Sequence, residues 1–192
     1  MKNLLAEIRG CKVCKAHLPL GPRPVVAADP DARIVIIGQA PGIKVHNTGI
    51  PWDDLSGRQL RKWLGVSDED FYNKKKIALV PMGFCYPGKG KSGDLPPRPE
   101  CAPLWHEDLL KSMSGLQICI LIGTYAQNYY LKGRTGKNLT ETVKAYQDHL
   151  PAYFPLPHPS PRNRFWLSKN PWFTQEVLPE LQQRVSEVLG VQ

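Results

Sequence analysis

The stretch "RIVIIGQAPG", residues 33–42, contains the signal that decides the fold. It begins with a short apolar run rich in β-branched residues, which predicts a buried strand. "GQAPG" at 38–42 is a loop bounded by glycines, of the kind that follows the carboxyl end of a parallel strand. A helical pattern at 58–65 comes next, so this part of the chain predicts one strand, loop and helix unit of an α/β protein.

The same alternation of strands and helices continues to the end of the chain. Further strands are predicted at 76–85, at 116–123 and at the start of 153–163, and helices at 2–9, 101–113, 124–133, 139–147 and 171–190. Strands that alternate with helices indicate a mostly parallel sheet. We therefore expect an α/β fold, a three-layer α/β/α sandwich with a central four-stranded sheet. At 192 residues, a single domain over 1–192 is expected.

Charge and hydropathy narrow the class of protein. Lysine and arginine outnumber aspartate and glutamate by 25 to 17, for a formal net charge of +8. This positive charge could serve to bind a nucleic acid, or the chain could simply be a basic soluble protein. The chain has no run of about 18 apolar residues, and its N-terminus lacks the apolar core of a signal peptide. We expect a cytoplasmic protein without a membrane partner, and a monomer.

"HPSPRN", residues 158–163, places one histidine in a rigid turn. Pro157, Pro159 and Pro161 restrict the backbone on both sides of His158, because proline fixes φ and disfavours helix at the residue before it. The pattern predicts that the backbone holds the imidazole of His158 in a fixed orientation.

Four of the five cysteines suggest a common centre. Cys11 and Cys14 are spaced C-x2-C, and Cys85 and Cys101 are separated by fifteen residues. Four thiolates can hold a [4Fe-4S] cluster or a structural zinc ion, and the second pair does not fit a zinc ribbon. Unlinked buried thiols are the alternative. Cys119, inside an apolar run, is expected in the core.

"GQAPG", "TGIPWDDLSG", the cysteine pattern and "HPSPRN" occur in this order. Together they resemble the uracil-DNA glycosylase superfamily, and the cysteines resemble its iron-sulfur families 4 and 5. "HPSPRN" is similar to the motif of the single-strand-selective monofunctional members. The resemblance covers residues 11–163 and implies excision of a damaged base from DNA by hydrolysis of its N-glycosidic bond, with a structural [4Fe-4S] cluster on the four cysteines.

The resemblance also implies roles for single residues. His158 would donate to the oxygen of the departing base. Asp54 matches the family 5 aspartate that positions water, and Asp53 is the alternative residue for this role. Asp54 could instead have a structural role, as the cap of the next helix. Trp52 falls where the family stacks a phenylalanine on the flipped base, although a core tryptophan also fits. The backbone of Gln39, Ala40, Pro41 and Gly42 would line the base pocket.

One position departs from the family pattern. Families 4 and 5 carry an asparagine four residues before the third cluster cysteine, where it reads the edge of uracil, and this chain has Pro81 there. Uracil remains the first expectation for the excised base, with hypoxanthine and xanthine as alternatives. His46 or Asn47 would substitute for the asparagine if their loop reached the pocket.

The segment after His158 is expected to contact DNA. The family uses this loop against the minor groove, which implies DNA contacts by Ser160, Pro161, Arg162, Asn163 and Arg164. Phe165 or Trp166 would serve as a wedge, unless these aromatics pack on the last helix. Lys89, Lys91 and Arg98, in the loop between the last two cluster cysteines, would face phosphates.

Two other functions compete with a monofunctional glycosylase acting in base excision repair. One is a superfamily member that binds DNA or a lesion without excising it, as Pro81 suggests. The other is a small-molecule enzyme on the same scaffold, because fold does not fix function.

Overall fold

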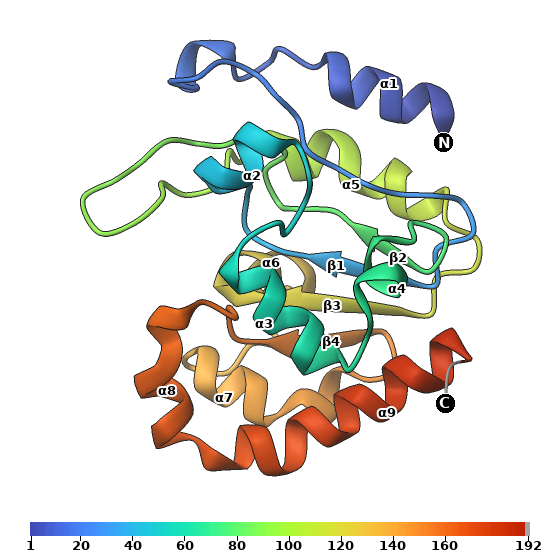
Figure 1. The fold of residues 1–192 in the computed structure, drawn as a ribbon, viewed down its shortest axis with the longest axis vertical. Coiled ribbons are helices and arrows are strands. Elements are labelled where there is room, and N and C mark those ends of the chain that lie inside the picture. The colour runs from blue at the N-terminus through green and yellow to red at the C-terminus, as the bar shows by residue number, and fades with distance from the viewer. Residues whose placement is uncertain (191–192) are drawn as a thin grey trace.

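Four parallel strands form the centre of the computed structural model, which describes residues 1–190 (Figure 1). They are β1 (Ile34–Ile37), β2 (Ile77–Leu79), β3 (Ile118–Ile122) and β4 (Tyr153–Leu156), in the order β2-β1-β3-β4. Ile34 of β1 lies opposite Ile77 on one side and Ile118 on the other. The α/β class and the parallel four-stranded sheet predicted from the sequence are confirmed.

Helices cover both faces of the sheet. They are α1 (Lys2–Gly10), α2 (Ile43–Thr48), α3 (Leu55–Leu64), α4 (Asp68–Tyr72), α5 (Cys101–Lys111), α6 (Gly123–Leu131), α7 (Leu139–Lys144), α8 (Arg164–Lys169) and α9 (Leu178–Leu189). Short 3₁₀ turns occupy Lys15–His17, Tyr146–His149 and Pro161–Asn163, and a π-helical turn at Phe173–Val177 precedes α9. No helix among residues 1–190 has the length and apolar character needed to cross a bilayer.

Alternate side chains of each strand enter two separate apolar layers. Ile34 and Ile36 of β1 pack in a layer with α3 and α9. Val35 and Ile37 pack on the opposite face with α1, α5 and α6. This division follows from the twofold period of a strand and produces the three layers visible in Figure 1, with α1 and α5 on one side of the sheet and α3 and α9 on the other.

Three short helices lie where the sequence analysis predicts no helix. α2 runs between Gly42 and Gly49, and the left-handed Gly49 (φ 73°) ends it. α4 is capped by Ser67, whose hydroxyl accepts from the amide of Asp70. α8 occupies a segment expected to be irregular. Helices this short show little apolar periodicity, so they cannot be predicted from their sequences.

The second strand is shorter than predicted. β2 ends at Leu79, and its edge is met by an antiparallel bridge from Ala27. The chain then leaves the sheet at Val80 and Pro81, so that residues up to Cys85 form a loop at the carboxyl edge. The loops after β1, β2 and β4 therefore gather at one edge of the sheet, where α/β proteins bind their ligands.

Candidate active site

A cavity at the carboxyl edge of the sheet collects most of the residues predicted for catalysis and base binding. Those that line it are Gln39, Ala40, Pro41, Gly42, Trp52, Asp54, Pro81 and His158. Val25, Gly38, Val45, Pro51 and Leu79 complete the lining. The sequence analysis did not single out these five residues, because small and apolar side chains of a pocket resemble those of a core.

The turn that carries His158 is closed by its own side chains. Asn163 Nδ2 donates to the carbonyl oxygen of His158 at 2.6 Å, and the hydroxyl of Ser160 accepts from the amide of Arg162 at 3.2 Å. Asn163 and Ser160, both predicted to contact DNA, thus also fix the backbone on which the imidazole is mounted. The geometry agrees with an aimed histidine.

The His158 ring has two important neighbours, the indole of Trp52 and the carboxylate of Asp54. Its centroid is 5.8 Å from that of Trp52, with the ring planes 31° apart. Burial lowers the pKa of His158 below its ordinary 6.5, and the negative charge of Asp54 acts in the opposite direction. The imidazole is therefore neutral at pH 7 and can donate one hydrogen bond and accept another.

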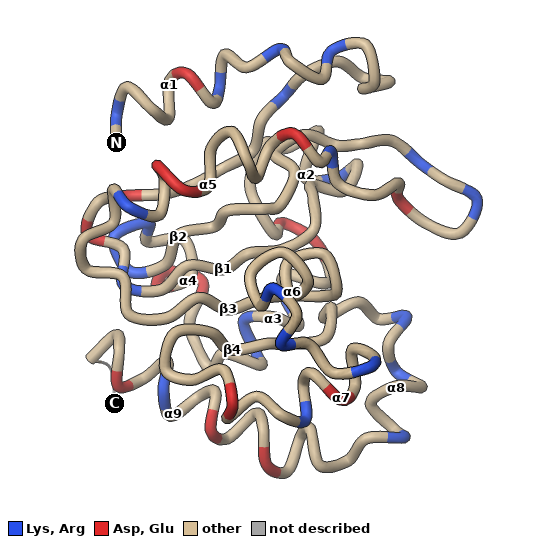
Figure 2. Tube along the Cα trace, turned by 180° about the vertical axis from the view of Figure 1, so that it is seen from behind, with Lys and Arg blue, Asp and Glu red and all other residues tan. Residues whose placement is uncertain are grey.

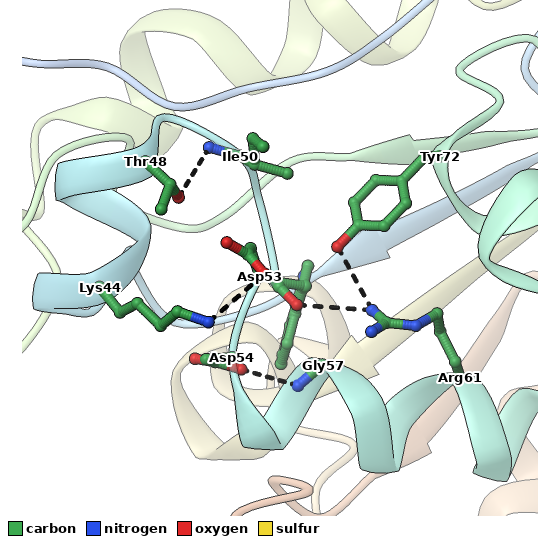
Figure 3. Close-up of polar contacts among 9 residues, drawn as sticks. Lys44, Thr48, Ile50, Asp53, Asp54, Gly57, Arg61 and Tyr72 are labelled. Atoms are coloured by element: carbon green, nitrogen blue, oxygen red, sulfur yellow. Dashed lines mark hydrogen bonds and ion pairs between the residues drawn. The ribbon is translucent and has the colours of Figure 1, made fainter.

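Asp54 caps a helix and also lines the cavity, so the capping role does not exclude a role in the site. It is the N-cap of α3, and its Oδ1 accepts from the amide of Gly57 at 2.7 Å (Figure 3). Asp54 also lines the cavity that contains His158. The cap fixes one carboxylate oxygen, so the orientation of the second is also determined.

Asp53 has a different environment. Its carboxylate pairs with Lys44 Nζ at 3.5 Å (Figure 3), and the Asp53 side chain remains 39% exposed. Asp53 is not among the described residues that line the cavity. The structure thus brings Asp54, and not Asp53, together with His158.

Trp52 has an unusual backbone conformation. Its φ of 57° lies in the left-handed region, which is rare for a large side chain and costs free energy. Arg61 Nη1 donates to the carbonyl oxygen of Trp52 at 3.5 Å, and Arg61 itself forms an ion pair with Asp68. A Cβ on Gly38 would lie 2.7 Å from the indole, so the glycine after β1 allows the ring to rest on the loop. Strain of this kind is concentrated at functional sites.

Pro81 lines the cavity, and its carbonyl oxygen is bonded to a buried histidine. His106 Nε2 lies 3.1 Å from the Pro81 oxygen, and His106 Nδ1 lies 2.5 Å from the hydroxyl of Tyr130. Burial lowers the pKa of His106 to about 4, so this histidine is neutral, donates through Nε2 and accepts through Nδ1. The sequence analysis did not single out His106, because nothing near it in the chain indicates a contact with Pro81.

The two suggested substitutes for the missing asparagine do not line the cavity. His46 is buried on α2 beside the ring of Tyr86, and Asn47 is exposed on the same helix. Among residues 1–190, the side chains of the cavity that carry polar atoms are those of Gln39, Asp54, His158 and Trp52.

An open groove continues from this cavity. It shares Gln39, Ala40, Gly42, Asp54 and His158 with the cavity, and adds Ser56, Lys89, Gly93, Asp94, Ser160 and Arg162. Arg162 Nη1 donates to the carbonyl oxygen of Ser92 at 3.2 Å, which joins the "HPSPRN" turn to the long loop before α5. Figure 2 shows lysine and arginine positions on this projecting loop and along α8. Of the predicted DNA contacts, the groove contains Ser160 and Arg162, and not Pro161, Asn163 or Arg164.

The aromatic residues after His158 occupy a helix rather than a loop, which corrects the prediction for this segment. Arg164 begins α8, and Phe165 on that helix is 82% exposed. Trp166 packs against Trp172 and Phe173, and its Nε1 donates to Thr140 Oγ1 at 2.8 Å. Packing on the C-terminal helix is therefore the correct reading for Trp166, and Phe165 is the free apolar side chain.

The cysteines of the predicted centre line a second, mostly apolar cavity. Cys11, Cys14, Cys85 and Cys101 meet there with Leu18, Pro22, Pro24, Phe84, Arg98 and Trp105. No three His, Cys, Asp or Glu side chains among residues 1–190 are grouped as ligands for one metal ion. Cys14 Sγ lies 3.4 Å from Glu100 Oε2, and Glu100 pairs with Arg98. Cys119 is buried in β3 away from this cavity, as predicted.

The chain matches a known family over most of its length. Residues 25–182 match the family model of the Uracil DNA glycosylase superfamily. The matched range contains the cavity, the groove and all four strands. The protein with this parallel sheet, and with His158 and Asp54 beside one cavity at its carboxyl edge, therefore belongs to the uracil DNA glycosylase superfamily.

Proposed function

We propose that the protein is a monofunctional DNA glycosylase that hydrolyses the N-glycosidic bond of a deaminated base in base excision repair. One observation carries this proposal. Asp54, His158 and Trp52 line a single cavity, and a groove that contains Arg162 and Lys89 opens from it. The cavity would receive the extruded nucleotide, and the groove would receive its backbone.

Asp54 is suited to the sugar side of the reaction. Cleavage of the bond gives the sugar oxocarbenium character, which a nearby carboxylate stabilises. The same carboxylate can orient the attacking water. The bond from Gly57 N to Oδ1 holds Asp54 in place, so this stabilisation needs no reorganisation during the reaction.

His158 is suited to the departing base. The base leaves as an anion, and a neutral imidazole can donate a hydrogen bond to the oxygen on which that charge collects. Burial keeps His158 neutral, and the "HPSPRN" turn with Trp52 holds the ring. Trp52 would also offer its indole as a surface on which the extruded base stacks. A carboxylate and an imidazole at the cavity favour direct hydrolysis over a Schiff base with an amine.

The selectivity for the excised base depends on residue 81, where proline offers no polar side chain to the base. Proline has no polar side chain, and the Pro81 carbonyl is already bonded to His106. Recognition of the base edge would rest on the backbone of Gln39 to Gly42 and on the side chains of Gln39 and His158. Such a pocket should discriminate between bases less strictly than a pocket with an asparagine. Without the asparagine, a wrong base leaves fewer hydrogen-bonding groups of the protein unpaired. Uracil is the first substrate expected, and hypoxanthine and xanthine follow.

DNA would be held by positive charge around the groove. Arg162 and Lys89 lie in the groove itself, and Lys91 lies farther along the same loop. Phe165 is exposed on α8, directly after the "HPSPRN" turn, where an apolar side chain can enter the base stack.

The four-cysteine cavity fits a [4Fe-4S] cluster. Four thiols from α1's end, from the loop after β2 and from α5 meet in surroundings that are otherwise apolar. Iron-sulfur clusters are held by four cysteine thiolates, and they space these ligands more widely than a single zinc ion does. The role of the cluster would be structural, since it would tie the N-terminal segment to the loop that reaches Arg162.

Base release from labelled oligonucleotides tests the proposal. The panel carries uracil, hypoxanthine or xanthine in single strands and in duplexes, and the enzymes are wild type, His158→Ala and Asp54→Asn. We expect abasic product from at least one base with wild type, and losses on the order of 10²-fold or more with each variant. A second possibility, binding of a lesion without excision, is favoured by Pro81. Lesion-selective binding with no abasic product from any substrate would establish it and refute the glycosylase.

A further inference from the structure

Trp105 is placed on the same side of α5 as one of the four cysteines. It follows Cys101 by four residues, and residues four apart on a helix lie on one face. Both side chains line the four-cysteine cavity. The indole is therefore built into the wall of this cavity.

The indole N–H of Trp105 is buried without a partner. Its Nε1 has almost no exposed surface and no hydrogen-bond acceptor among residues 1–190. Buried polar atoms almost always have a partner, and each exception calls for an explanation such as a bound group. Indole nitrogen can only donate, so the missing partner must be an acceptor.

The neighbouring protein groups do not supply that acceptor. The carboxylate of Glu100 is bonded to Arg98 and to Cys14. The side chains that line the cavity with Trp105 are thiols, prolines, leucine, phenylalanine and Arg98, which can only donate. The chemistry of the cavity leaves sulfur as the acceptor that Trp105 would meet.

We infer that Trp105 donates its indole N–H to a sulfur of the iron-sulfur cluster, and that this bond sets the reduction potential and the retention of the cluster. The inference rests on the cluster proposed above. A hydrogen bond to cluster sulfur stabilises the reduced, more negative form more than the oxidised form, so it raises the potential. It also holds the ligands in place, as outer partners of metal sites do. Trp105 is in this sense a positioning residue, not a catalytic one.

The test uses Trp105→Phe, which keeps an aromatic ring and removes the N–H. Trp172→Phe is the matched control, because the Nε1 of Trp172 donates to Asn170 at 3.1 Å and its ring packs with Trp166 and Phe173, away from the cysteines. All proteins are purified and reconstituted without oxygen, and the midpoint potential and the rate of iron release to a chelator are measured.

We expect a more negative potential for Trp105→Phe and iron release faster by on the order of 10-fold to 100-fold, with the control like wild type. In wild type, exchange of N–H for N–D should also shift the Fe–S stretching bands, which tests the bond even if the variant loses its cluster. Equal potentials and equal iron release in wild type and Trp105→Phe would refute the inference. So would a wild-type protein that binds zinc and no iron. Base release, measured on the same samples, decides the glycosylase proposal separately.

Discussion

The indole of Trp52 and the imidazole of His158 are neighbours in the lining of one cavity, with centroids 5.8 Å apart and planes 31° apart. Trp52 reaches this position only by adopting a φ of 57°. The two residues lie on different loops, one before α3 and one after β4. Their contact therefore joins the two halves of the proposed catalytic site, and its strain must be compensated by the surrounding structure.

Gly57 is the residue that accommodates the Trp52 backbone. A Cβ at Gly57 would lie 1.8 Å from the carbonyl oxygen of Trp52, so Gly57→Ala must displace that segment. We expect a loss of about 3 kcal/mol in the free energy of unfolding, measured with urea, and a larger loss of base release. Gly10→Ala is the control, because a Cβ there meets nothing within 4 Å. A Gly57→Ala protein as stable as wild type would contradict this account of Trp52.

Asp54 and Asp53 can be separated by matched amide variants. Asparagine caps helices about as well as aspartate, so Asp54→Asn should change stability by less than about 1 kcal/mol while base release falls on the order of 10²-fold or more. Asp53→Asn removes only an exposed pair with Lys44 and should leave both quantities nearly unchanged. Equal losses of activity in the two variants would show that the site does not distinguish them.

The protonation of His158 can be followed by NMR of its ring. Burial lowers its pKa below 6.5 and Asp54 opposes this shift, so Asp54→Asn should lower the pKa further. The acid limb of kcat/KM in wild type should accordingly lie below pH 6.5, because the neutral imidazole is the form that functions. Asp53→Asn serves as the control, with no change expected. A His158 pKa above 6.5 would be incompatible with the buried position described here.

His106 makes stability depend on pH. The unfolded chain binds a proton with a pKa near 6.5, whereas the folded chain does so only near 4, so stability is fully present above pH 6.5 and falls as the pH falls toward 4. Between pH 7 and pH 5 wild type should lose about 2 kcal/mol more than His106→Gln, in which this group does not titrate. Urea unfolding at both pH values measures the difference. All other groups are the same in both proteins, so equal losses would exclude the effect.

Arg162 is expected to contact a phosphate of bound DNA. Arg162→Ala should weaken binding to all sequences alike and reduce the slope of log K against log salt by about 1. Arg33→Ala is the control, because Arg33 donates to the Val188 carbonyl at the opposite edge of the sheet from the groove. An unchanged salt slope in Arg162→Ala would place the phosphate contacts elsewhere, on Lys89 or on α8.

Local patterns in the sequence were enough to predict the sheet. The apolar runs at Ile34–Ile37 and Ile118–Ile122 are long enough to indicate buried strands, and their alternation with helices leaves few arrangements of a parallel sheet. Proline and glycine likewise indicated the loop at 38–42 and the turn at 158–163, because their backbone restrictions are local. The short helices α2, α4 and α8 were missed for the same reason, since a helix of five or six residues has too few positions to show a period.

The candidate site likewise has features that local sequence patterns predict and features that only the tertiary structure shows. By itself the sequence determined which residue types are present and in what order: an aspartate pair before Ser56, a histidine framed by prolines, and four cysteines. Only the tertiary structure decided that Asp54 lines the cavity while Asp53 pairs with Lys44, that His106 engages the carbonyl of Pro81, and that Trp105 buries an unpartnered N–H beside the cysteines. The physical reason is that backbone preferences act between neighbours in the chain, whereas burial and hydrogen bonding depend on contacts between segments far apart in the sequence.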